Sequence, residues 1–251
     1  MKCRHCKTEL KLSLIDLGST PPSNAYVSSK KLSSPEKYFP LQVLVCESCW
    51  LVQTKDFMEA NELFNEEYAY FSSVSTSWLK HAEQYVKEMI KRFGFNKKSH
   101  IVEIAANDGY LLQYVKKLKI PCTGIEPTNS TAQAARAKGI EVVENFFSVK
   151  LAQKLKRKGK QADLITANNV LAHVPDINDF TKSIEILLKD EGVVTLEFPH
   201  LQNLIKYNQF DTIYHEHFSY LSLNTVRRIF EKNNLKIFKV EELNTHGGSL
   251  R

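Results

Sequence analysis

The sequence predicts an α/β protein, with a doubly wound parallel sheet preceded by a small zinc-binding β domain. Apolar strand segments alternate with amphipathic helical segments from Ser99 onward, which is typical of a parallel sheet covered on both faces. Two Cys-x-x-Cys pairs, "CRHC" and "CESC", stand near the N-terminus. A turn of small residues, "AANDG", follows the first strand of the alternating part, as nucleotide-binding folds require.

The two cysteine pairs predict one structural zinc site. Cys3 and Cys6 form the first pair and Cys46 and Cys49 the second, and each pair places two thiolates on one tight turn. Disulfides are the alternative, and a reducing compartment disfavours them. Because four thiolates leave no open coordination position, we expect the metal to hold structure and not to react. Cys122 stands alone and is expected to be a small core residue.

The first 98 residues divide into two predicted segments. Residues 1–55 form the zinc domain, in which "LSLIDLG" and "YFPLQVLVC" are strands joined by a Pro- and Ser-rich loop. So small a unit needs the metal to fold. Residues 56–98 form a helical linker that contributes to the active site, with one helix predicted over 66–94 and Gly94 ending it.

Residues 99–251 form the predicted α/β domain. Its helices are expected to bury one apolar face, such as that of Leu111, Leu112, Val115 and Leu118. Strands are expected over 100–106, 122–127, 140–143, 162–169, 193–199 and 235–243, and helices over 111–118, 130–139, 176–192 and 224–234.

The turn after the first strand predicts a cofactor site. Small residues let the backbone approach a ligand, and the absence of G-x-G-x-x-G disfavours a dehydrogenase. Glu126 ends the second strand, where a carboxylate accepts both ribose hydroxyls in nicotinamide and S-adenosylmethionine folds. The alternative is that Glu126 only caps the following helix.

Later strand ends add further candidates, because the carboxyl ends of parallel strands form the ligand crevice. Asn145 and Phe146 follow the third strand, where an adenine would lie, although Phe146 or Phe147 is expected to belong to the core. Asn168, Asn169 and His173 follow the fourth strand.

The segment "IYHEHFSYLS" concentrates titratable side chains, and it is not a zinc-protease motif. That motif is H-E-x-x-H, whereas His215 and His217 lie only two positions apart. Another explanation is therefore needed, and a surface turn with polar side chains is the alternative to a catalytic site.

Taken together, the motifs resemble the S-adenosylmethionine-dependent sugar C-methyltransferases, whose catalytic domain is a Rossmann-like class I methyltransferase domain. The resemblance covers essentially the whole chain. It is carried by "CRHC", "CESC", "LGSTPPSNAYV", "YAYFSSVSTSWLKHA", "VEIAANDGYLL", "GIEPT", "NNVLAHV", "YHEHFSYLS" and "HGGSLR". It implies methylation of a thymidine-diphosphate-linked 4-keto-deoxysugar at the carbon beside the ketone.

The resemblance also implies roles for particular residues. His217 is the expected base, Glu216 fixes its tautomer, and Tyr68 and Tyr214 donate hydrogen bonds to the developing oxyanion, with His173 nearby. The implied cofactor residues are Tyr70, Ser72, Glu103, Ala105, Asn107, Asp108, Gly109, Glu126, Pro127, Asn145, Phe146, Asn168 and Asn169.

Two departures from the family pattern stand out. Ala105 replaces a usual glycine, so we expect its φ to stay negative. Members continue into a third, C-terminal domain, whereas this chain stops at Arg251, where the final strand of the sheet is expected to begin.

Composition and charge separate the alternatives. A zinc-ribbon RNA methyltransferase would need a basic, aromatic-studded face, and the formal charge of +6 is too scattered for one. A truncated cofactor-binding remnant is the other alternative. No apolar run is long enough to span a membrane. We expect a cytoplasmic monomer that binds a nucleotide sugar, zinc and S-adenosylmethionine, and neither nucleic acid nor membrane.

Overall fold

The computed structural model describes residues 1–24, 26–57 and 70–251. The chain forms two compact units. The first comprises Met1–Asn65, Asn169–Asn178 and Glu197–Arg251, and the second comprises Glu66–Asn168 and Asp179–Leu196. Each unit is thus assembled from separate stretches of sequence. Among the described residues, no helix has the length and apolarity needed to cross a bilayer.

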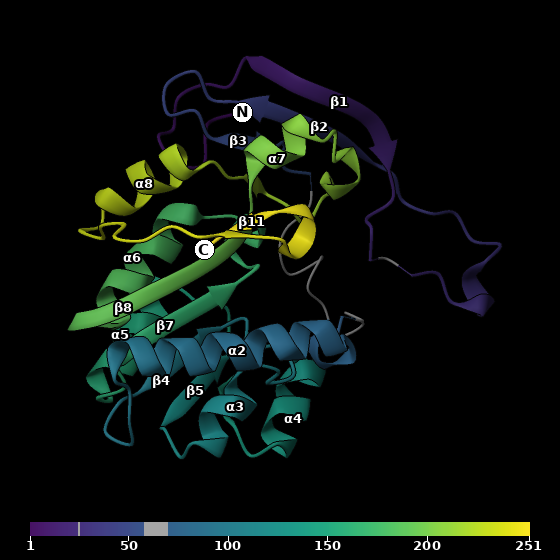
Figure 1. Cartoon of the computed structure of the whole chain (residues 1–251). Helices are drawn as coiled ribbons and strands as arrows, with labels where there is room; N and C mark the ends of the chain where they lie inside the picture. Colours follow the sequence, from purple (N-terminus) through teal and green to yellow (C-terminus); the bar gives the residue numbers. More distant parts are fainter. Residues whose placement is uncertain (25, 58–69) are drawn as a thin grey trace. The chain divides into compact units, whose positions relative to one another are not determined.

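The first unit is built on a four-stranded antiparallel sheet in the order β1-β2-β3-β9. Strands β1 (Leu12–Thr20) and β2 (Phe39–Val45) confirm the two predicted strands, and β3 (Val52–Thr54) follows the second cysteine pair (Figure 1). Strand β9 (Ser219–Tyr220) pairs with β3, Val52 opposite Tyr220. The sheet therefore joins the cysteine-bearing segment to the histidine-rich segment of the sequence.

A compact apolar core holds this sheet to helix α7 (Leu201–Lys206). Leu41, Val43, Val52 and Tyr220 pack with Leu201 on this helix. Helix α8 (Leu223–Glu231) begins after Ser222, whose side chain accepts a hydrogen bond from Thr225 N and so caps the helix.

The second unit holds the parallel sheet, in the order β6-β5-β4-β7-β8. Its parallel strands are β4 (Ile101–Ile104), β5 (Cys122–Ile125), β6 (Glu141–Val143) and β7 (Ala162–Asn168). Helices α2 (Thr76–Phe93), α3 (Leu112–Lys117) and α4 (Asn129–Ala137) lie beside β4 and β5 (Figure 1). The remaining helices are α5 (Val149–Arg157) and α6 (Ile177–Leu187). The predicted doubly wound arrangement is confirmed.

Strand β8 (Leu188–Pro199) passes from the second unit into the first. There Phe198 and Pro199 pair antiparallel with β11 (Ser249–Leu250), which pairs in turn with β10 (Glu242–Leu243). The antiparallel pairs make the sheet mixed. The prediction of a strand over 235–243 was wrong for all but its end, because β11 offers only two residues to pair with.

Further boundaries differ from the sequence-based expectation. The helix predicted over 176–192 ends at Leu187, because β8 begins at Leu188. The helix predicted over 66–94 begins at Thr76, since Ser75 is its N-cap and accepts a hydrogen bond from Trp78 N. It ends as predicted at Gly94, whose φ of 70° is the left-handed C-cap conformation. Leu118 is exposed and not part of the apolar face of α3, because the helix has already ended at Lys117.

Candidate functional site

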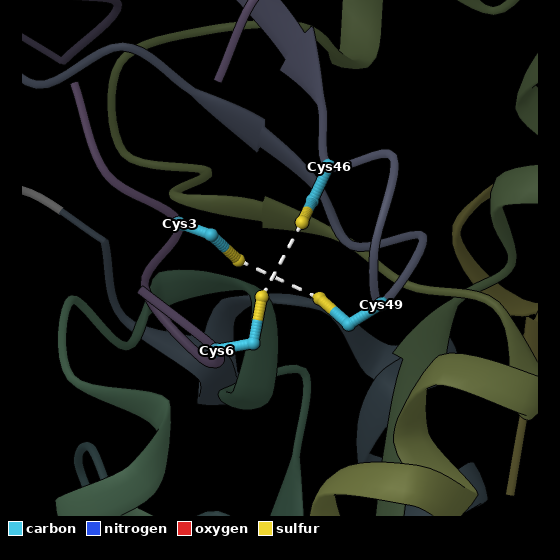
Figure 2. A group of neighbouring side chains, drawn as sticks. All are labelled: Cys3, Cys6, Cys46 and Cys49. Atoms are coloured by element: carbon cyan, nitrogen blue, oxygen red, sulfur yellow. Dashed lines mark hydrogen bonds between the residues drawn. The ribbon is translucent and has the colours of Figure 1, made fainter. Parts of the chain in front are cut away.

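The four N-terminal cysteines converge on one point (Figure 2). All four Sγ atoms lie within 4.8 Å of one another, with Cys3 and Cys49 3.5 Å apart and Cys6 and Cys46 3.4 Å apart. No disulfide joins them. Such a cluster fits the tetrahedral thiolate set that binds structural zinc.

Both cysteine pairs sit on the same kind of backbone turn. Lys7 N donates to Cys3 O, and Trp50 N donates to Cys46 O. Lys7 and Trp50 each have a left-handed φ, 63° and 64°. The two equivalent turns direct the thiols inward, so all four ligand positions are protein atoms and none is left for a reacting water.

The turn after β4 is fastened to the end of β5 by Glu126. Its two carboxylate oxygens accept hydrogen bonds from Asn107 N (2.9 Å) and Thr128 N (3.0 Å). Thr128 is the N-cap of α4, so the expected alternative of a helix-capping role also holds in part. A carboxylate has about four acceptor sites, so these two bonds leave capacity for ribose hydroxyls.

Ala105 adopts a φ of 54°, and the expectation of a negative φ was wrong. The position keeps the backbone conformation that a glycine would favour, because the chain must turn sharply between β4 and Asn107. The next residue, Ala106, donates to Ile125 O, and Glu126 holds Asn107. These bonds compensate for the strain at Ala105.

Gly109 is required by a close approach between the turn and its neighbours. Its φ is 78°, and a Cβ added here would lie 2.4 Å from Ile140 Cδ1 and 3.2 Å from Ala135 Cβ. Only glycine lets the turn lie this close to α4 and the start of β6.

Buried carboxyl groups surround the turn. Both oxygens of Glu103 and Oδ1 of Asp108 accept no hydrogen bond within the described part of the chain. Burial raises the pKa of Glu103 well above its ordinary value, against the opposing effect of the Tyr110 side chain. Burial also raises the pKa of Glu126, which the Thr128 and Asn107 amides oppose. The neutral form of Glu103 is therefore favoured, and the buried Asp108 carboxylate is the group beside the small-residue turn that fits a cationic ligand such as S-adenosylmethionine.

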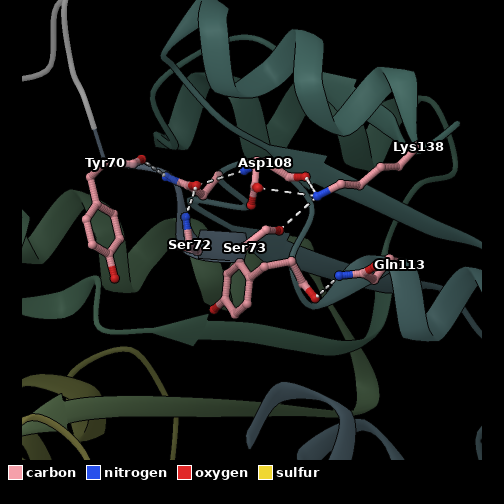
Figure 3. A network of polar contacts seen from close by, with 8 residues as sticks. Tyr70, Ser72, Ser73, Asp108, Gln113 and Lys138 are labelled. Carbon is pink, nitrogen blue, oxygen red and sulfur yellow. Dashed lines mark hydrogen bonds and ion pairs between the residues drawn. The ribbon is translucent and has the colours of Figure 1, made fainter. Parts of the chain in front are cut away.

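The segment before α2 is fastened to the same turn (Figure 3). Asn107 Oδ1 accepts from Ser72 N at 2.9 Å, and Asn107 Nδ2 donates to Tyr70 O at 3.0 Å. Lys138 Nζ donates to Asp108 O at 2.6 Å and lies 3.3 Å from the Asp108 carboxylate. The structure thus brings Tyr70 and Ser72 to the predicted cofactor turn. Lys138 was missed, because only the fold places it there.

The remaining cofactor candidates occupy different environments. Asn145 and Phe146 are exposed after β6, while Phe147 packs edge-on against Phe180 at 5.7 Å, as expected for the core member of the pair. Asn168 is buried at the end of β7. The other candidates are Pro127, which is half-buried, and Asn169, whose N–H donates to Glu197 O.

In the first unit, His217 is held by two hydrogen bonds. Its Nδ1 lies 2.8 Å from Thr212 O, and its Nε2 lies 2.9 Å from the Tyr214 hydroxyl. A carbonyl oxygen only accepts, so Nδ1 carries the proton and Nε2 accepts from Tyr214. His173 packs edge-on against the same ring, with centroids 4.6 Å apart. The structure therefore groups three of the five predicted catalytic side chains, and Tyr68 lies outside the described residues.

Glu216 has a different role from the one expected. Thr212 O, and not Glu216, fixes the tautomer of His217. The Glu216 carboxylate instead accepts hydrogen bonds from the side chains of Asn24 and Ser23. A backbone carbonyl leaves no signal in the sequence, which is why this partner was missed.

His215 points away from His217. Its Nε2 lies 3.2 Å from Phe39 O, at the start of β2. Tyr220 is a buried neighbour of His217 that the prediction did not assign, with ring centroids 6.0 Å apart. It reaches this place through the short strand β9, which is too short to recognise in the sequence.

Burial sets the charge state of the histidine pair. It lowers the pKa of His217 to about 4, against the opposing effect of the Thr212 carbonyl. Burial, and then the neighbouring His217, lower the pKa of His173 well below its ordinary value. Both imidazoles are therefore neutral at neutral pH, and His217 Nε2 is available to take a proton.

Comparison with known proteins agrees with this architecture. Residues 3–64 match the family described as "Putative zinc binding domain", and residues 78–240 match the family described as "Methyltransferase domain". The chain belongs to the methyltransferase-domain family. It thus carries an S-adenosylmethionine-dependent methyltransferase domain of class I fold, preceded by a zinc-binding region, and these predictions are confirmed.

A curated relative agrees with the predicted resemblance to C-methyltransferases. The chain is 31% identical to C-methyltransferase NovU of Streptomyces niveus over 99% of its own length. It spans only 59% of that relative.

Solved structures show the same fold at low identity. Magnesium protoporphyrin IX methyltransferase (ChlM) from Synechocystis, solved with bound SAH, is 14% identical with a TM-score of 0.52, covering 69% of this chain and 83% of its own. The PH0226 protein from Pyrococcus horikoshii is 16% identical with a TM-score of 0.56, and the match covers 78% of this chain and 97% of that protein.

Proposed function

We propose that the protein methylates a carbon beside the ketone of a nucleotide-linked 4-keto-deoxysugar, with His217 as the base. The observation that carries the proposal is the fixed, neutral tautomer of His217, whose Nε2 is directed at the Tyr214 hydroxyl. The 31% identity to a C-methyltransferase supports carbon as the acceptor. Thymidine diphosphate as the nucleotide, and a cytoplasmic monomer as the working form, are also proposals.

The reaction needs a carbon nucleophile, which only a stabilised enolate provides. His217 Nε2 removes the proton from the carbon beside the ketone, and Nδ1–H stays on Thr212 O. Before this transfer the Tyr214 hydroxyl turns from Nε2 to the ketone oxygen, which frees the Nε2 lone pair and lets the hydroxyl stabilise the negative charge that develops on that oxygen. Tyr68 is proposed as a second donor. A base with so low a pKa is weak, but the imidazolium formed next to the enolate is stabilised by their attraction in a buried site.

The second unit supplies the methyl donor site. When bound, S-adenosylmethionine provides an electrophilic methyl group on its sulfonium. We assign the ribose hydroxyls to Glu126, and the methionine ammonium to Asp108 and the turn that ends at Gly109. Asn145 and Phe146 would lie near the adenine, together with Pro127. The bound cofactor would supply its methyl group to the enolate carbon, and the electron pair of the broken methyl–sulfur bond would stay on sulfur.

Deuterium wash-in tests the proton-transfer step without methyl transfer. The protein is incubated in D2O with the 4-keto-deoxysugar nucleotide and no methyl donor, and exchange at the carbon beside the ketone is followed by NMR. The wild type should exchange, and His217→Asn should lower the rate by about 10²–10⁴-fold. His215→Asn is the matched control and should change the rate little, because its ring points to Phe39 O. Exchange that persists in His217→Asn would assign the base to His173 or Tyr68.

A further inference from the structure

Arg4 is a buried cation in the middle of the first cysteine pair. Its side chain is 5% exposed, although arginine usually lies at the surface. The guanidinium donates from Nε to Phe218 O (3.2 Å), from NH1 to Pro175 O (3.1 Å) and from NH2 to Thr54 O (3.2 Å). NH2 also pairs with the half-exposed carboxylate of Asp56.

The acceptors of Arg4 lie next to the two histidines of the proposed proton-transfer site. Phe218 directly follows His217, and Pro175 lies two residues after His173. The Thr54 hydroxyl, on the third acceptor residue, itself donates to His217 O. The guanidinium also lies 4.8 Å from the centre of the Phe218 ring, a cation–π distance. One side chain therefore ties together the backbone segments that carry both imidazoles.

The backbone of Arg4 is fixed as well. Arg4 N donates to Gln53 Oε1 at 2.9 Å, and Asn178 Nδ2 donates to Arg4 O at 3.2 Å. The cysteine turn thus places the guanidinium at a defined position. A buried guanidinium that loses its acceptors is strongly destabilised, so its planar fork imposes a fixed geometry on the three carbonyls.

We propose that Arg4 is a positioning residue, which holds His173 and His217 in their edge-on arrangement and so connects the first cysteine pair to the proton-transfer site. The inference rests on the proposed role of His217 as base. A purely structural arginine would contribute to stability alone, whereas a positioning arginine also sets the environment of the His217 ring.

The test separates these roles by observing the imidazole directly. His217 ring signals are assigned in the ligand-free protein by difference from His217→Asn, and their pH titration is followed by NMR. In Arg4→Met the ring loses its fixed enclosure and water enters, so the titration midpoint should rise from about 4 by at least about one unit. Asp56→Asn is the matched control, because it removes only a half-exposed ion pair and keeps the three carbonyl bonds, so its midpoint should stay unchanged.

Arg4→Lys provides the second variant. An ammonium reaches one or two of the acceptors but not all three in the planar geometry, so the midpoint should shift in the same direction by less. Should Arg4→Met fail to fold, the inference is judged on Arg4→Lys, with folding checked by metal content and far-UV circular dichroism. Folded variants whose His217 ring titrates as in the wild type would overturn the inference.

Deuterium wash-in then reports the consequence for chemistry. Misplacing the base by about 1 Å costs up to about 100-fold, so Arg4→Met should lower the maximal exchange rate with little change in the substrate concentration at half-maximal rate. If His217→Asn exchanges normally, the assignment of His217 as the base fails, while the NMR titration still decides the positioning role of Arg4. If the titration moves and exchange in Arg4→Met stays at the wild-type rate, the positioning role in catalysis is overturned.

Discussion

Ala105 holds a backbone conformation that glycine adopts without strain. At a φ of 54° an L-residue is disfavoured by about 1–2 kcal/mol, and replacing Ala105 by glycine would remove this cost. Glycine also has more conformational freedom in the unfolded chain, which reduces the stabilisation by about 0.4–1 kcal/mol. Ala105→Gly should therefore raise the free energy of unfolding by about 1 kcal/mol, measured from urea denaturation. Ala106→Gly is the control, because Ala106 is fully buried and outside the left-handed region, and it should destabilise. A lower midpoint for Ala105→Gly would show that the φ assigned to this residue is wrong.

Glu126 is the residue on which the cofactor assignment depends most directly. Glu126→Gln keeps the size of the side chain but removes the charge that ribose hydroxyls would bind. S-adenosylhomocysteine affinity should fall by about 1.5–3 kcal/mol, the range for a hydrogen bond to a charged group, as measured by calorimetry. Because burial raises the pKa of Glu126, affinity should also begin to fall at a higher pH than for an ordinary glutamate as the solution is acidified.

Glu144→Gln is the matched control for this measurement. Glu144 lies just beyond β6, where it binds Asn129 and Arg136 at the surface, so its loss should leave affinity unchanged. Equal affinities for Glu126→Gln and the wild type would remove Glu126 from the ribose site.

Single residues were predictable where their chemistry is local. The four cysteines were found because two ligands on one short turn leave a spacing in the sequence. Thr212 was not found, because it acts through a backbone carbonyl, and Arg4 was not found because its acceptors lie far along the chain.

At the scale of elements, Lys138 fastens the segment before α2 to the cofactor turn. Its ammonium contacts Ser73 Oγ, Asp108 O and the Asp108 carboxylate, while being 32% exposed. Lys138→Met should weaken this attachment by about 1 kcal/mol, so amide exchange over residues 70–75 should become about fivefold faster. Hydrogen exchange with mass spectrometry measures this rate.

Lys116→Met is the control for that measurement. Lys116 likewise donates to a backbone carbonyl, that of Gly139, but it makes no contact with the segment before α2. Faster exchange over 70–75 in both variants would mean that the effect is general, and the attachment through Lys138 would be refuted.

Long elements with a clear period were predictable, whereas most strands of two or three residues were not, although β6 was expected. Helix α2 was recognised from its apolar face, although its start was misplaced because Ser75 caps it later than the periodicity suggested. Strands β3, β9 and β10 have two or three residues each, so no alternation develops in them. The segment 235–240 shows the converse: its composition favours a strand, but it lies outside the strands that the structure describes, and Phe238 is 63% exposed.

At the scale of the whole molecule, sequence order and spatial units do not coincide. The first unit takes in residues 169–178 and 197–251 as well as the N-terminal segment. The prediction placed a domain boundary near residue 55, where the predicted zinc-binding β unit gives way to a helical pattern. The pairing of β9 with β3 could not be foreseen, since it joins residues far apart in sequence through two ladder positions.

The pairing of these strands predicts which residues should lose amide protection when zinc is lost. Structural zinc contributes about 10–16 kcal/mol in small zinc-dependent folds, which is comparable to the stability of a whole domain. The wild type should contain one zinc per chain, and Cys46→Ser should lose it. Because β9 pairs with β3, which follows the second cysteine pair, amide protection should be lost over residues 213–222 as well as over β2 and β3.

Cys122→Ser is the control, because Cys122 lies in the second unit and outside the cluster, and it should change neither zinc content nor this protection. S-adenosylhomocysteine should still bind Cys46→Ser by calorimetry, since the residues assigned to the ribose and to the methionine end lie in the second unit. Full protection over 213–222 in zinc-free protein would show that the histidine segment holds its fold without the metal.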